Sequence, residues 1–473
     1  VVHRRQELSM HRLSQAIVAI TAVILFTALS SDIHAQPKAA AKPSPEEMAK
    51  RVVSLEKQVA QLIGVVNAQG KALKDAQSNQ KLFVSQEEFD TACANMLKDA
   101  ATQSSTVKGF DLWSTVDVQL YGKIKLDAAY DSGRSNTGNF ARWVNPGEKQ
   151  RGDGQFNMTA NETRLGLKFK GPQTEDLKTS ALLEMDFYGG GDETSPNPRL
   201  RHAFLNLEWP KEKLSVLAGQ TWDVISPLNP GTLNYTVLWW GGNIGMRRPQ
   251  IRVTKGCTLN DDTELTLQGA LLRTMGHTSG FDPGDTGEDA GFPSVQGRAA
   301  VTFPLFGKKK ATIGVSGHFG QEEYDTNASG DNLNLYSWSD NIDACVHVNG
   351  WLTVKAEAFT GQNLAAYAGG IGQGVNAVGT DVSEIKSSGG WFAACMKPCD
   401  KWMFNVGASG EVITGGVTLD GTRTSNACVF GNVIYEFNKN ASVGFELSNW
   451  HTEYKGAGDG NDIRAQTSFI YKF

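Results

Sequence analysis

Residues 465–473 read AQTSFIYKF, and this stretch decides the fold. Its alternate positions Phe469, Tyr471 and Phe473 are aromatic, and polar residues stand between them. A β-strand turns successive side chains to opposite faces. One aromatic face and one polar face are typical of a strand in an outer-membrane β-barrel, where the apolar face meets lipid and the polar face lines a wet lumen. The stretch therefore predicts that the chain closes on a barrel strand.

The same period of two recurs upstream, from residue 116 onward. Leu120, Ile124 and Leu126 alternate with Lys123 and Lys125, so one face is apolar and the other is charged. Similar alternation is found at residues 164–170, 183–187 and 443–448. A soluble β-sandwich also alternates, because its polar face is solvated and its apolar face forms a core. The number of strands and the lengths of their connections distinguish the two folds.

The connections favour the barrel. About sixteen candidate strands fit between residues 116 and 473, joined by short and long segments in turn. The short connections are 171–178, 210–212, 255–262, 305–309, 397–400 and 438–440, and the long ones are 131–154, 223–246, 273–294, 321–332, 362–385 and 453–461. Short turns at one end and long loops at the other are the barrel pattern. The sequence predicts an all-β fold, a 16-stranded antiparallel transmembrane β-barrel over residues 116–473, with an N-terminal α-helical coiled-coil segment.

The first 45 residues read as an export signal and a linker. Basic residues such as Arg4 and Arg5 precede an apolar stretch at residues 16–29, and Ala35 offers a cleavage point. The apolar stretch is shorter than the roughly 20 residues that span a membrane. Residues 1–35 are therefore expected to be a signal peptide, for which Val1 and Met10 both serve as a start, and residues 36–45 an Ala/Lys/Pro linker.

A heptad pattern follows in residues 46–77. Val52, Val59 and Val66 recur every seven residues, and Leu55 and Leu62 occupy the interleaved position. This seam predicts a coiled coil of unspecified oligomer number, and the alternative is one amphipathic helix packed against another element. Residues 78–115 are expected to hold a short helix, opened by a capping box at residues 85–88, and a polar linker.

The net charge, the cysteine spacing and the absence of known motifs argue against a nucleic-acid-binding protein, a metal site and an enzyme. A formal net charge of -5 argues against a nucleic-acid partner. No Cys-x-x-Cys or His-x-x-x-His spacing points to a metal, no motif points to a cofactor, and no nucleophile elbow or P-loop points to an enzyme. Six cysteines in an exported chain suggest disulfides, with a local Cys395–Cys399 bridge as one pair. The pairing stays open among Cys93, Cys257, Cys345, Cys395, Cys399 and Cys428.

Five short motifs resemble the DcaP-like trimeric porins of Gram-negative outer membranes. They are LYGKIKLDA at 120–128, ETRLG at 162–166, LRHAFL at 200–205, AGQTW at 218–222 and PQIR at 249–252. The resemblance covers residues 117–473. It implies a sixteen-stranded barrel, a homotrimer and diffusion of small anionic solutes such as dicarboxylates. The expected partners of such a barrel are outer-membrane lipid and lipopolysaccharide. An even number of strands puts both ends of the barrel domain on the periplasmic side, which places the coiled coil in the periplasm.

The candidate site is a pore constriction. In porins of this size the loop after the fifth strand folds inward, and here that loop is residues 223–246, running into two arginines. The strand phase adds basic and acidic residues on the lumen side, opposed across the water. The predicted constriction residues are Lys123, Lys125, Arg164, Glu184, Asp186, Asp223, Tyr235, Arg247, Arg248, Arg252 and Arg464.

Arginine suits carboxylate capture because its planar fork binds both oxygens. Arg164, Arg248 and Arg252, with Lys123 and Lys125, are therefore expected to make the pore favour small anions. The alternatives for these residues are a solvated lumen wall or internal salt bridges, and for the loop a cap over a trimer seam. The sequence predicts a passive channel for small hydrophilic solutes. The alternative function is a structural barrel whose coiled coil braces the envelope through peptidoglycan or periplasmic proteins.

Overall fold

The computed structural model describes most of the predicted barrel region. The described residues are 116–147, 154–276, 285–325, 332–378, 381–416 and 419–473. The predicted signal peptide, linker, coiled coil and short helix lie outside the described residues and stay predictions. The chain divides into two compact units, Val1–Thr106 and Val107–Phe473, and all the structure described below belongs to the second.

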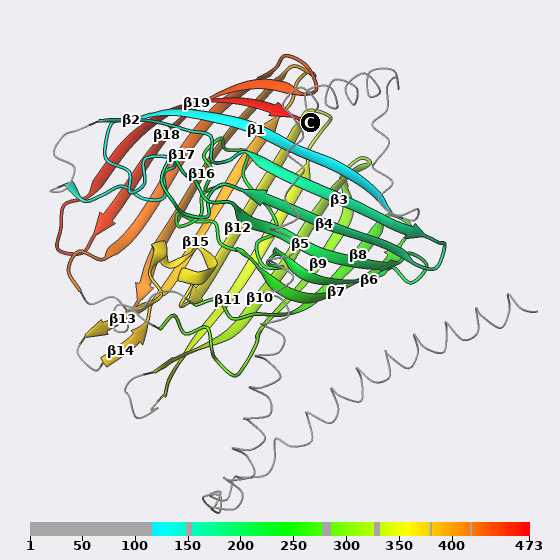
Figure 1. The fold of residues 1–473 in the computed structure, drawn as a ribbon, viewed down its shortest axis with the longest axis horizontal. Helices are drawn as coiled ribbons and strands as arrows, with labels where there is room; N and C mark the ends of the chain where they lie inside the picture. The colour runs from blue at the N-terminus through cyan, green and yellow to red at the C-terminus, as the bar shows by residue number, and fades with distance from the viewer. Residues whose placement is uncertain (1–115, 148–153, 277–284, 326–331, 379–380, 417–418) are drawn as a thin grey trace, which may run out of the picture. The chain divides into compact units, whose positions relative to one another are not determined.

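The described residues form strands almost throughout (Figure 1). The first strands are β1 (Asp117–Asp131), β2 (Gln155–Thr159), β3 (Arg164–Gln173), β4 (Lys178–Asp186), β5 (Arg199–Trp209), β6 (Leu214–Trp222), β7 (Arg247–Asn260), β8 (Thr263–Leu272) and β9 (Ser294–Phe306). The others are β10 (Lys309–Asp325), β11 (Asn332–His347), β12 (Leu352–Gln362), β15 (Lys386–Met396), β16 (Trp402–Gly415), β17 (Arg423–Glu436), β18 (Ala441–Tyr454) and β19 (Gly460–Lys472). The connection between β12 and β15 carries the 3-10 helices η1 (Ala365–Tyr367) and η2 (Gly370–Gly372) and a hairpin of β13 (Val375–Val378) and β14 (Asp381–Glu384).

The sheet closes on itself. β1 pairs antiparallel with β19 on one side and with both β2 and β3 on the other. Since β2 and β3 pair with successive parts of β1, they form one wall strand interrupted at residues 160–163. Each of the other wall strands pairs antiparallel with its neighbour in sequence, which gives sixteen strands around the ring. The predicted sixteen-stranded antiparallel barrel is confirmed. Closure joins the first and last strands of the sheet, so the ring has no terminal edge strand.

The connections alternate in length as predicted. Short turns such as 261–262 and 307–308 join strands at one end of the barrel. Long connections such as 132–154, 223–246 and 363–385 join strands at the other end. Among the described residues, no helix is long and apolar enough to cross a membrane.

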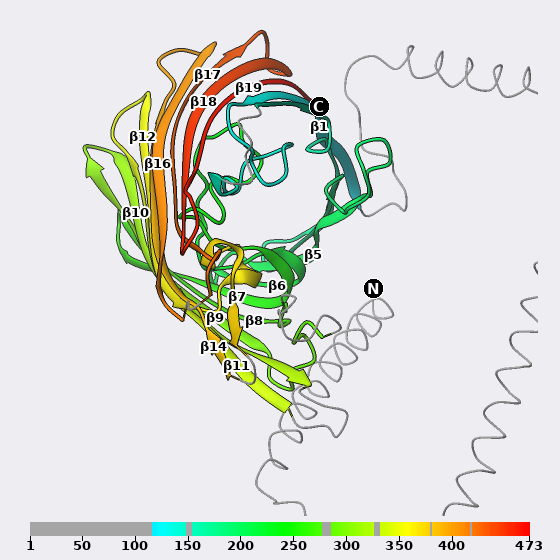
Figure 2. The same ribbon diagram turned by 90° about the vertical axis from the view of Figure 1, so that its left-hand side faces the viewer.

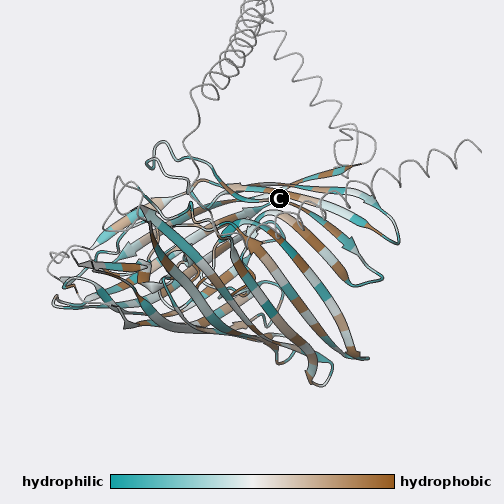
Figure 3. Ribbon diagram, turned by 90° about the horizontal axis from the view of Figure 1, so that it is seen from below, coloured by the Kyte–Doolittle hydropathy of each residue, from teal (hydrophilic) through white to brown (hydrophobic). Residues whose placement is uncertain are grey.

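The strands carry apolar side chains outward and polar ones inward. Leu120, Ile124 and Leu447 are exposed on the outer surface, whereas their sequence neighbours Lys125 and Glu446 are buried on the lumen side. Figure 3 shows the resulting change between apolar and polar positions along each strand. This is the inverse of a soluble barrel and matches the alternation of the sequence.

The packed core of the barrel lies in its lumen. One cluster joins the inner face of β15–β18 to loop residues, among them Trp391, Phe430 and Trp450 from the wall and Leu238 and Val144 from loops. Figure 2 shows loop segments, coloured cyan and green, inside the ring of strands. The long loops therefore fold into the barrel and fill part of it.

The described cysteines do not form disulfides. Cys257, Cys345, Cys395, Cys399 and Cys428 are all free, so the predicted Cys395–Cys399 bridge is wrong. Cys395 is held within the ladder of β15, between Thr353 of β12 and Asn405 of β16. Cys399 lies in the exposed turn that follows, outside the ladder that holds Cys395. Cys93 lies outside the described residues.

Candidate functional site

The connection between β6 and β7, residues 223–246, is the main element inside the barrel, and we call it the inner loop. Its two ends are tied together, since the Asp223 amide donates to the Met246 carbonyl (2.8 Å) and the Met246 amide donates to Asp223 Oδ2 (2.9 Å). Arg248 Nε lies 2.9 Å from Asp223 Oδ1, and both side chains are buried. Gln296 of β9 donates to the same carboxylate (3.0 Å). The loop thus leaves and rejoins the wall at one place.

Two buried carboxylates on far strands hold the middle of the inner loop. Glu357 of β12 accepts hydrogen bonds from the Leu228 amide (2.8 Å) and the Ser226 hydroxyl (2.6 Å). Glu446 of β18 accepts from the Leu233 amide (2.6 Å) and the Thr232 hydroxyl (2.7 Å). A loop placed inside a barrel must find partners for its amides, and a carboxylate is a strong acceptor. The loop is therefore fastened across the lumen.

The inner loop contains strained backbone. Val237, Leu238 and Trp240 have φ values of 48°, 67° and 63°, in the left-handed region that non-glycine residues rarely adopt. Each such residue costs on the order of 1–3 kcal/mol unless its surroundings enforce it. Leu238 is fully buried against the wall of β15–β18, so packing enforces this shape. The loop has one fixed course rather than many.

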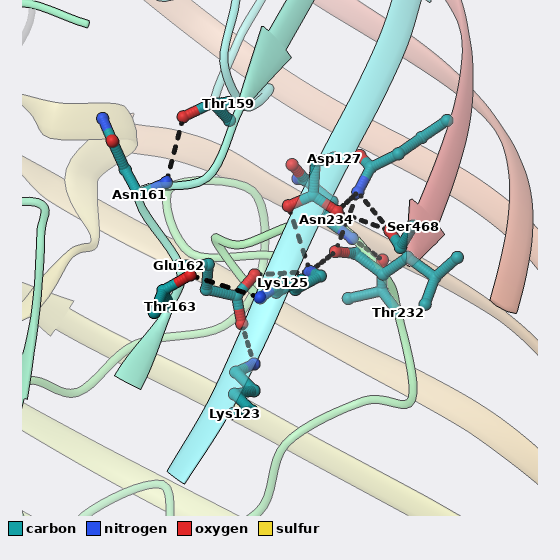
Figure 4. A network of polar contacts seen from close by, with 12 residues as sticks. Lys123, Lys125, Asp127, Thr159, Asn161, Glu162, Thr163, Thr232, Asn234 and Ser468 are labelled. Atoms are coloured by element: carbon teal, nitrogen blue, oxygen red, sulfur yellow. Dashed lines mark hydrogen bonds and ion pairs between the residues drawn. The ribbon is translucent and has the colours of Figure 1, made fainter. Parts of the chain in front are cut away.

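The opposite side of the lumen is charged, and its first feature is a break in the wall. Residues 160–163 leave the ladder between β2 and β3, and the Thr163 amide donates to the Ala160 carbonyl (2.9 Å). The break carries Glu162 inward, where its two oxygens lie 2.5 Å from Lys123 Nζ and 2.5 Å from Lys125 Nζ (Figure 4). Thr163 Oγ1 accepts from the Lys125 amide (3.2 Å), which replaces the missing ladder bond.

A second group of charges lies on β4 and β5. Arg201 contacts both Glu184 (2.7 Å) and Asp186 (3.0 Å). Arg199 contacts Asp186 (2.7 Å) and donates to the Tyr235 hydroxyl of the inner loop. The bidentate Arg–carboxylate contacts fix the guanidinium planes. The inner loop and the charged wall therefore meet at Tyr235.

Water reaches three cations of this wall more than the carboxylates that they contact. The side chains of Lys123, Arg164 and Arg199 are 19%, 27% and 29% exposed. Their partners Glu162 and Asp186 are 8% and 0% exposed. The order does not extend to the other pairs of this wall, because Lys125 and Asp127 are both 4% exposed and Arg201 (3%) is less exposed than Glu184 (11%). At Lys123, Arg164 and Arg199, however, the carboxylate lies behind the cation, so positive charge faces the lumen there.

Tyr188, in the connection between β4 and β5, packs on this region. Its ring lies 4.1 Å from the Tyr235 ring, centroid to centroid. Burial, reinforced by the negative charges of Glu162 and Asp127, raises the pKa of Tyr188 above its ordinary value. The phenol stays neutral at physiological pH and adds no negative charge to the lumen.

A row of four tryptophans, two of them in the inner loop, continues the charged wall. Trp222, Trp239, Trp240 and Trp143 follow one another at centroid distances of 5.6, 6.1 and 6.4 Å. The guanidinium of Arg247 lies 4.3 Å from the Trp222 centroid, and its Nη1 atom has no hydrogen-bonding partner among the described residues. Cation–π contact supports an arginine but leaves its in-plane donors unused. Within the described part of the chain, Arg247 thus forms no salt bridge with a carboxylate.

A small cavity adjoins these residues. It has a volume of about 290 Å³ and lies between the inner loop and the wall of β6 and β7. Trp222, Asn229, Trp239, Arg252 and Gln268 are among its lining residues. Arg252 donates to Gln250 Oε1 (3.0 Å) and to the Trp222 carbonyl. Neither acceptor is charged, so the positive charge of Arg252 is not compensated by these two contacts.

Two predicted constriction residues are buried in loop contacts. Arg248 is fully buried, with its Nη2 donating to Asp223 Oδ2 (3.2 Å) and to the Ala366 carbonyl (3.1 Å). Arg464 is 1% exposed, pairs with Asp131 (2.8 Å), and donates to two carbonyls of the loop after β1. The strand phase places both on the lumen side, but the loops cover them.

The structure brings together most of the other predicted residues. Lys123, Lys125, Arg164, Glu184 and Asp186 share one wall, and Tyr235 and Arg247 join it through hydrogen-bond or cation–π contacts. The sequence reasoning missed Glu162 and Arg199, and it did not assign a position to Arg201. The two arginines carry a signal that strand phase could have found, because both lie on β5 two residues apart. The inward course of Glu162 depends on a break in the strand and has no such signal.

Comparisons with known proteins identify the fold. The outer-membrane channel DcaP of Acinetobacter baumannii aligns over 77% of this chain and 100% of its own, with a TM-score of 0.62 and 21% identity. OmpF of Salmonella typhi aligns over 76% of this chain and 99% of its own, with a TM-score of 0.51 and 14% identity. No protein-family profile matches the chain, and no curated protein matches it in sequence.

These identities are low, so the likeness concerns the course of the backbone. The alignment with DcaP spans that whole protein and about three quarters of this chain. That share agrees with the extent of the barrel, residues 117–473, over which the sequence motifs resemble DcaP-like proteins. The chain therefore has the fold of the DcaP channel.

Proposed function

We propose that this protein is an outer-membrane porin, a passive diffusion channel that favours small anionic solutes and performs no covalent chemistry. One observation carries the proposal: three cations of the β1–β5 wall reach water while the carboxylates that they contact are buried behind them. Lys123, Arg164 and Arg199 are the exposed members. The fold is shared with channels, but the charge arrangement is the basis for the preferred solute.

The arrangement suits carboxylates for a physical reason. A buried carboxylate fixes the position of its arginine and leaves part of the planar N–H fork free. An entering carboxylate can then replace lost hydration with hydrogen bonds that are already oriented. The preference should stay moderate, because each cation is partly compensated by its partner. Strong trapping would also oppose release, which a channel needs.

The far half of the lumen does not cancel this field. Glu357 and Glu446 are 6% and 1% exposed and accept hydrogen bonds from the inner loop. Their charge is screened by those donors and separated from water by the loop. Glu357 and Glu446 thus serve to hold the loop. Glu184 and Asp186, which the sequence analysis sets opposite the basic residues, instead lie on the same wall as the cations and pair with Arg199 and Arg201.

The apolar exterior supports a location in the outer membrane, in contact with lipid and lipopolysaccharide. From the sequence resemblance we also propose a homotrimer whose coiled coil lies in the periplasm. Mass measurement of the complex in detergent tests the trimer, and a monomer would refute it. Leu55→Asp with Leu62→Asp should abolish coil assembly and leave the barrels folded.

Solute flux tests the function. Purified protein in a planar bilayer should give discrete conductance steps, and proteoliposomes should admit succinate faster than a diamine of similar size. Absence of any conductance from folded protein would support the alternative, a structural barrel. Equal or faster entry of the diamine would overturn the anion preference while leaving a channel function intact.

A further inference from the structure

A second group of uncompensated cations lies in the long-loop region, apart from the residues that carry the proposed selectivity. Arg142 belongs to the loop after β1, and Arg423 is the first residue of β17. The two guanidinium carbons lie 4.5 Å and 4.2 Å from the centroid of the same indole, that of Trp143. Arg142 also lies 4.9 Å from the centroid of Trp240, in the inner loop. We call these four residues the arginine platform.

The platform is a built structure. Asn426 of β17 donates to the carbonyls of both Arg142 and Trp240, at 2.7 Å each, and so joins two loops to the wall. The backbone of Gly372 in η2 comes so close to Trp143 that an added Cβ would lie 3.0 Å from the indole. Three separate segments therefore hold the indole that carries the two arginines.

The arginines use only part of their hydrogen-bonding capacity. Arg423 Nε donates to the Ile371 carbonyl (2.7 Å), and Arg142 donates to the side-chain oxygen of Asn136 through Nη2 (2.5 Å) and Nε (3.1 Å). Among the described residues, no carboxylate forms a salt bridge with either side chain. The Nη atoms of Arg423 have no acceptor in that part of the chain. Both side chains are half-buried, so water has access to them.

Two like charges are therefore held close together without a counter-ion. Because both guanidinium groups contact one indole, they lie within about one Debye length at 0.1 M salt, roughly 10 Å. Burial lowers the pKa of Arg142, yet an arginine side chain stays protonated at neutral pH. The repulsion is relieved when an anion binds between them. Stacking on an indole also fixes each guanidinium plane, which favours planar oxyanions over spherical ones.

We propose that the arginine platform is a capture site for the carboxylate groups of solutes, located in the long-loop region and acting before the constriction. This inference rests on the proposed function in one respect only, that captured solutes then move on through the channel. Trp240 and Trp239 connect it to Arg247, at a centroid distance of 6.1 Å between the two indoles, so a captured anion enters beside the next free cation.

Capture is measured as a rate of entry. Citrate, a tricarboxylate, is added to one side of a single channel in KCl, and the frequency of current interruptions gives the on-rate for that side. Arg142→Gln with Arg423→Gln should lower the on-rate from one side by about tenfold, the size of an electrostatic steering effect, and leave the other side unchanged. An unchanged on-rate from both sides, or an equal fall from both, would overturn the proposal.

Two further variants separate capture from general charge. Arg134→Gln removes an exposed cation of the same loop that has no indole contact, and the on-rate should stay within about twofold. Trp143→Leu keeps both arginines but removes their support, and the on-rate should fall from the same side as in the double variant. If Arg134→Gln lowers the rate as much as the double variant, long-range charge explains it and the site does not exist.

The zero-current potential keeps this proposal distinct from the proposed function. A loss of one-sided citrate capture with the chloride preference intact supports both. A preserved on-rate with an intact chloride preference sinks the platform alone. A preference for potassium in the unmodified protein sinks the proposed selectivity, while one-sided citrate binding still reports on the platform.

Discussion

The two halves of the lumen wall differ in whether loops cover them or water reaches them. On β15–β18 the inner face carries an apolar cluster that includes Trp391, Phe430 and Trp450, and loop residues such as Leu238 and Val144 cover it. On β1–β5 the inner face is charged, and Lys123, Arg164 and Arg199 stay in contact with water. A barrel of sixteen strands encloses more space than its wall side chains fill. The loop-covered face of β15–β18, which we call the dry half, narrows that space. The water-exposed face of β1–β5, which we call the wet half, supplies the charges that select solutes.

Carboxylates show the difference most clearly. In the dry half, Glu446 accepts hydrogen bonds from loop amides and so positions backbone. In the wet half, Glu162 accepts from lysines and so positions charge. One residue type has a structural role on one side and an electrostatic role on the other, and the partner decides which.

Releasing the inner loop should have the largest effect. Glu357→Ala with Glu446→Ala removes the acceptors of several buried loop donors, each of which costs about 1–3 kcal/mol when left unpaired. The loop should leave its course, and single-channel conductance should rise clearly above that of the unmodified protein. Glu453→Ala, an exposed carboxylate in the same strand as Glu446, is the matched control and should change nothing. Unchanged conductance in the double variant would mean that the loop is held by packing alone.

Removing single charges from the wet half should change the anion preference by less than release of the inner loop changes the conductance. Removing a carboxylate and removing a cation should shift the preference in opposite directions. Glu162→Gln uncovers Lys123 and Lys125, so the preference for anions should rise, whereas Lys123→Gln should lower it. One charge acting over about 8 Å in water is worth roughly 0.5 kcal/mol, or about a twofold change in the permeability ratio. The zero-current potential in a KCl gradient measures both. A shift of the same sign in the two variants would contradict the assignment.

Salt should have the smallest effect and should touch only the wet half. Raising KCl from 0.1 M to 1 M shortens the Debye length from about 10 Å to about 3 Å. The anion preference should therefore decline toward the ratio of a neutral pore, while the contribution of the inner loop to pore width stays constant. Measuring the zero-current potential and the exclusion of a neutral sugar across this range separates the two. A selectivity that is independent of salt would point to size rather than charge.

The barrel could be predicted from sequence because its information is repeated. Each strand carries the same period of two, and an error in one strand does not change the pattern of the others. The motif at residues 120–128 and the aromatic alternation at residues 465–473 fall on β1 and β19, which pair to close the ring. Signals of this kind are local, and local patterns determine both the strand and its facing.

The site could be predicted only in part, because burial within a lumen depends on loops. Strand phase correctly places Lys123, Arg164 and Glu184 on the lumen side of the wall. It places Arg248 and Arg464 there as well, yet loop carbonyls cover both. Which lumen residues reach water is a tertiary property, and the sequence pattern of a strand does not contain it.

The zero-current potential of the unmodified protein shows whether the wet half of the lumen prefers anions. A single purified channel is placed between two KCl solutions that differ tenfold in concentration. Chloride should be more permeant than potassium, and Arg164→Gln with Arg199→Gln should reduce the ratio of the two permeabilities. A potential that shows potassium to be more permeant, or a ratio that the two substitutions leave unchanged, would mean that these cations do not select anions.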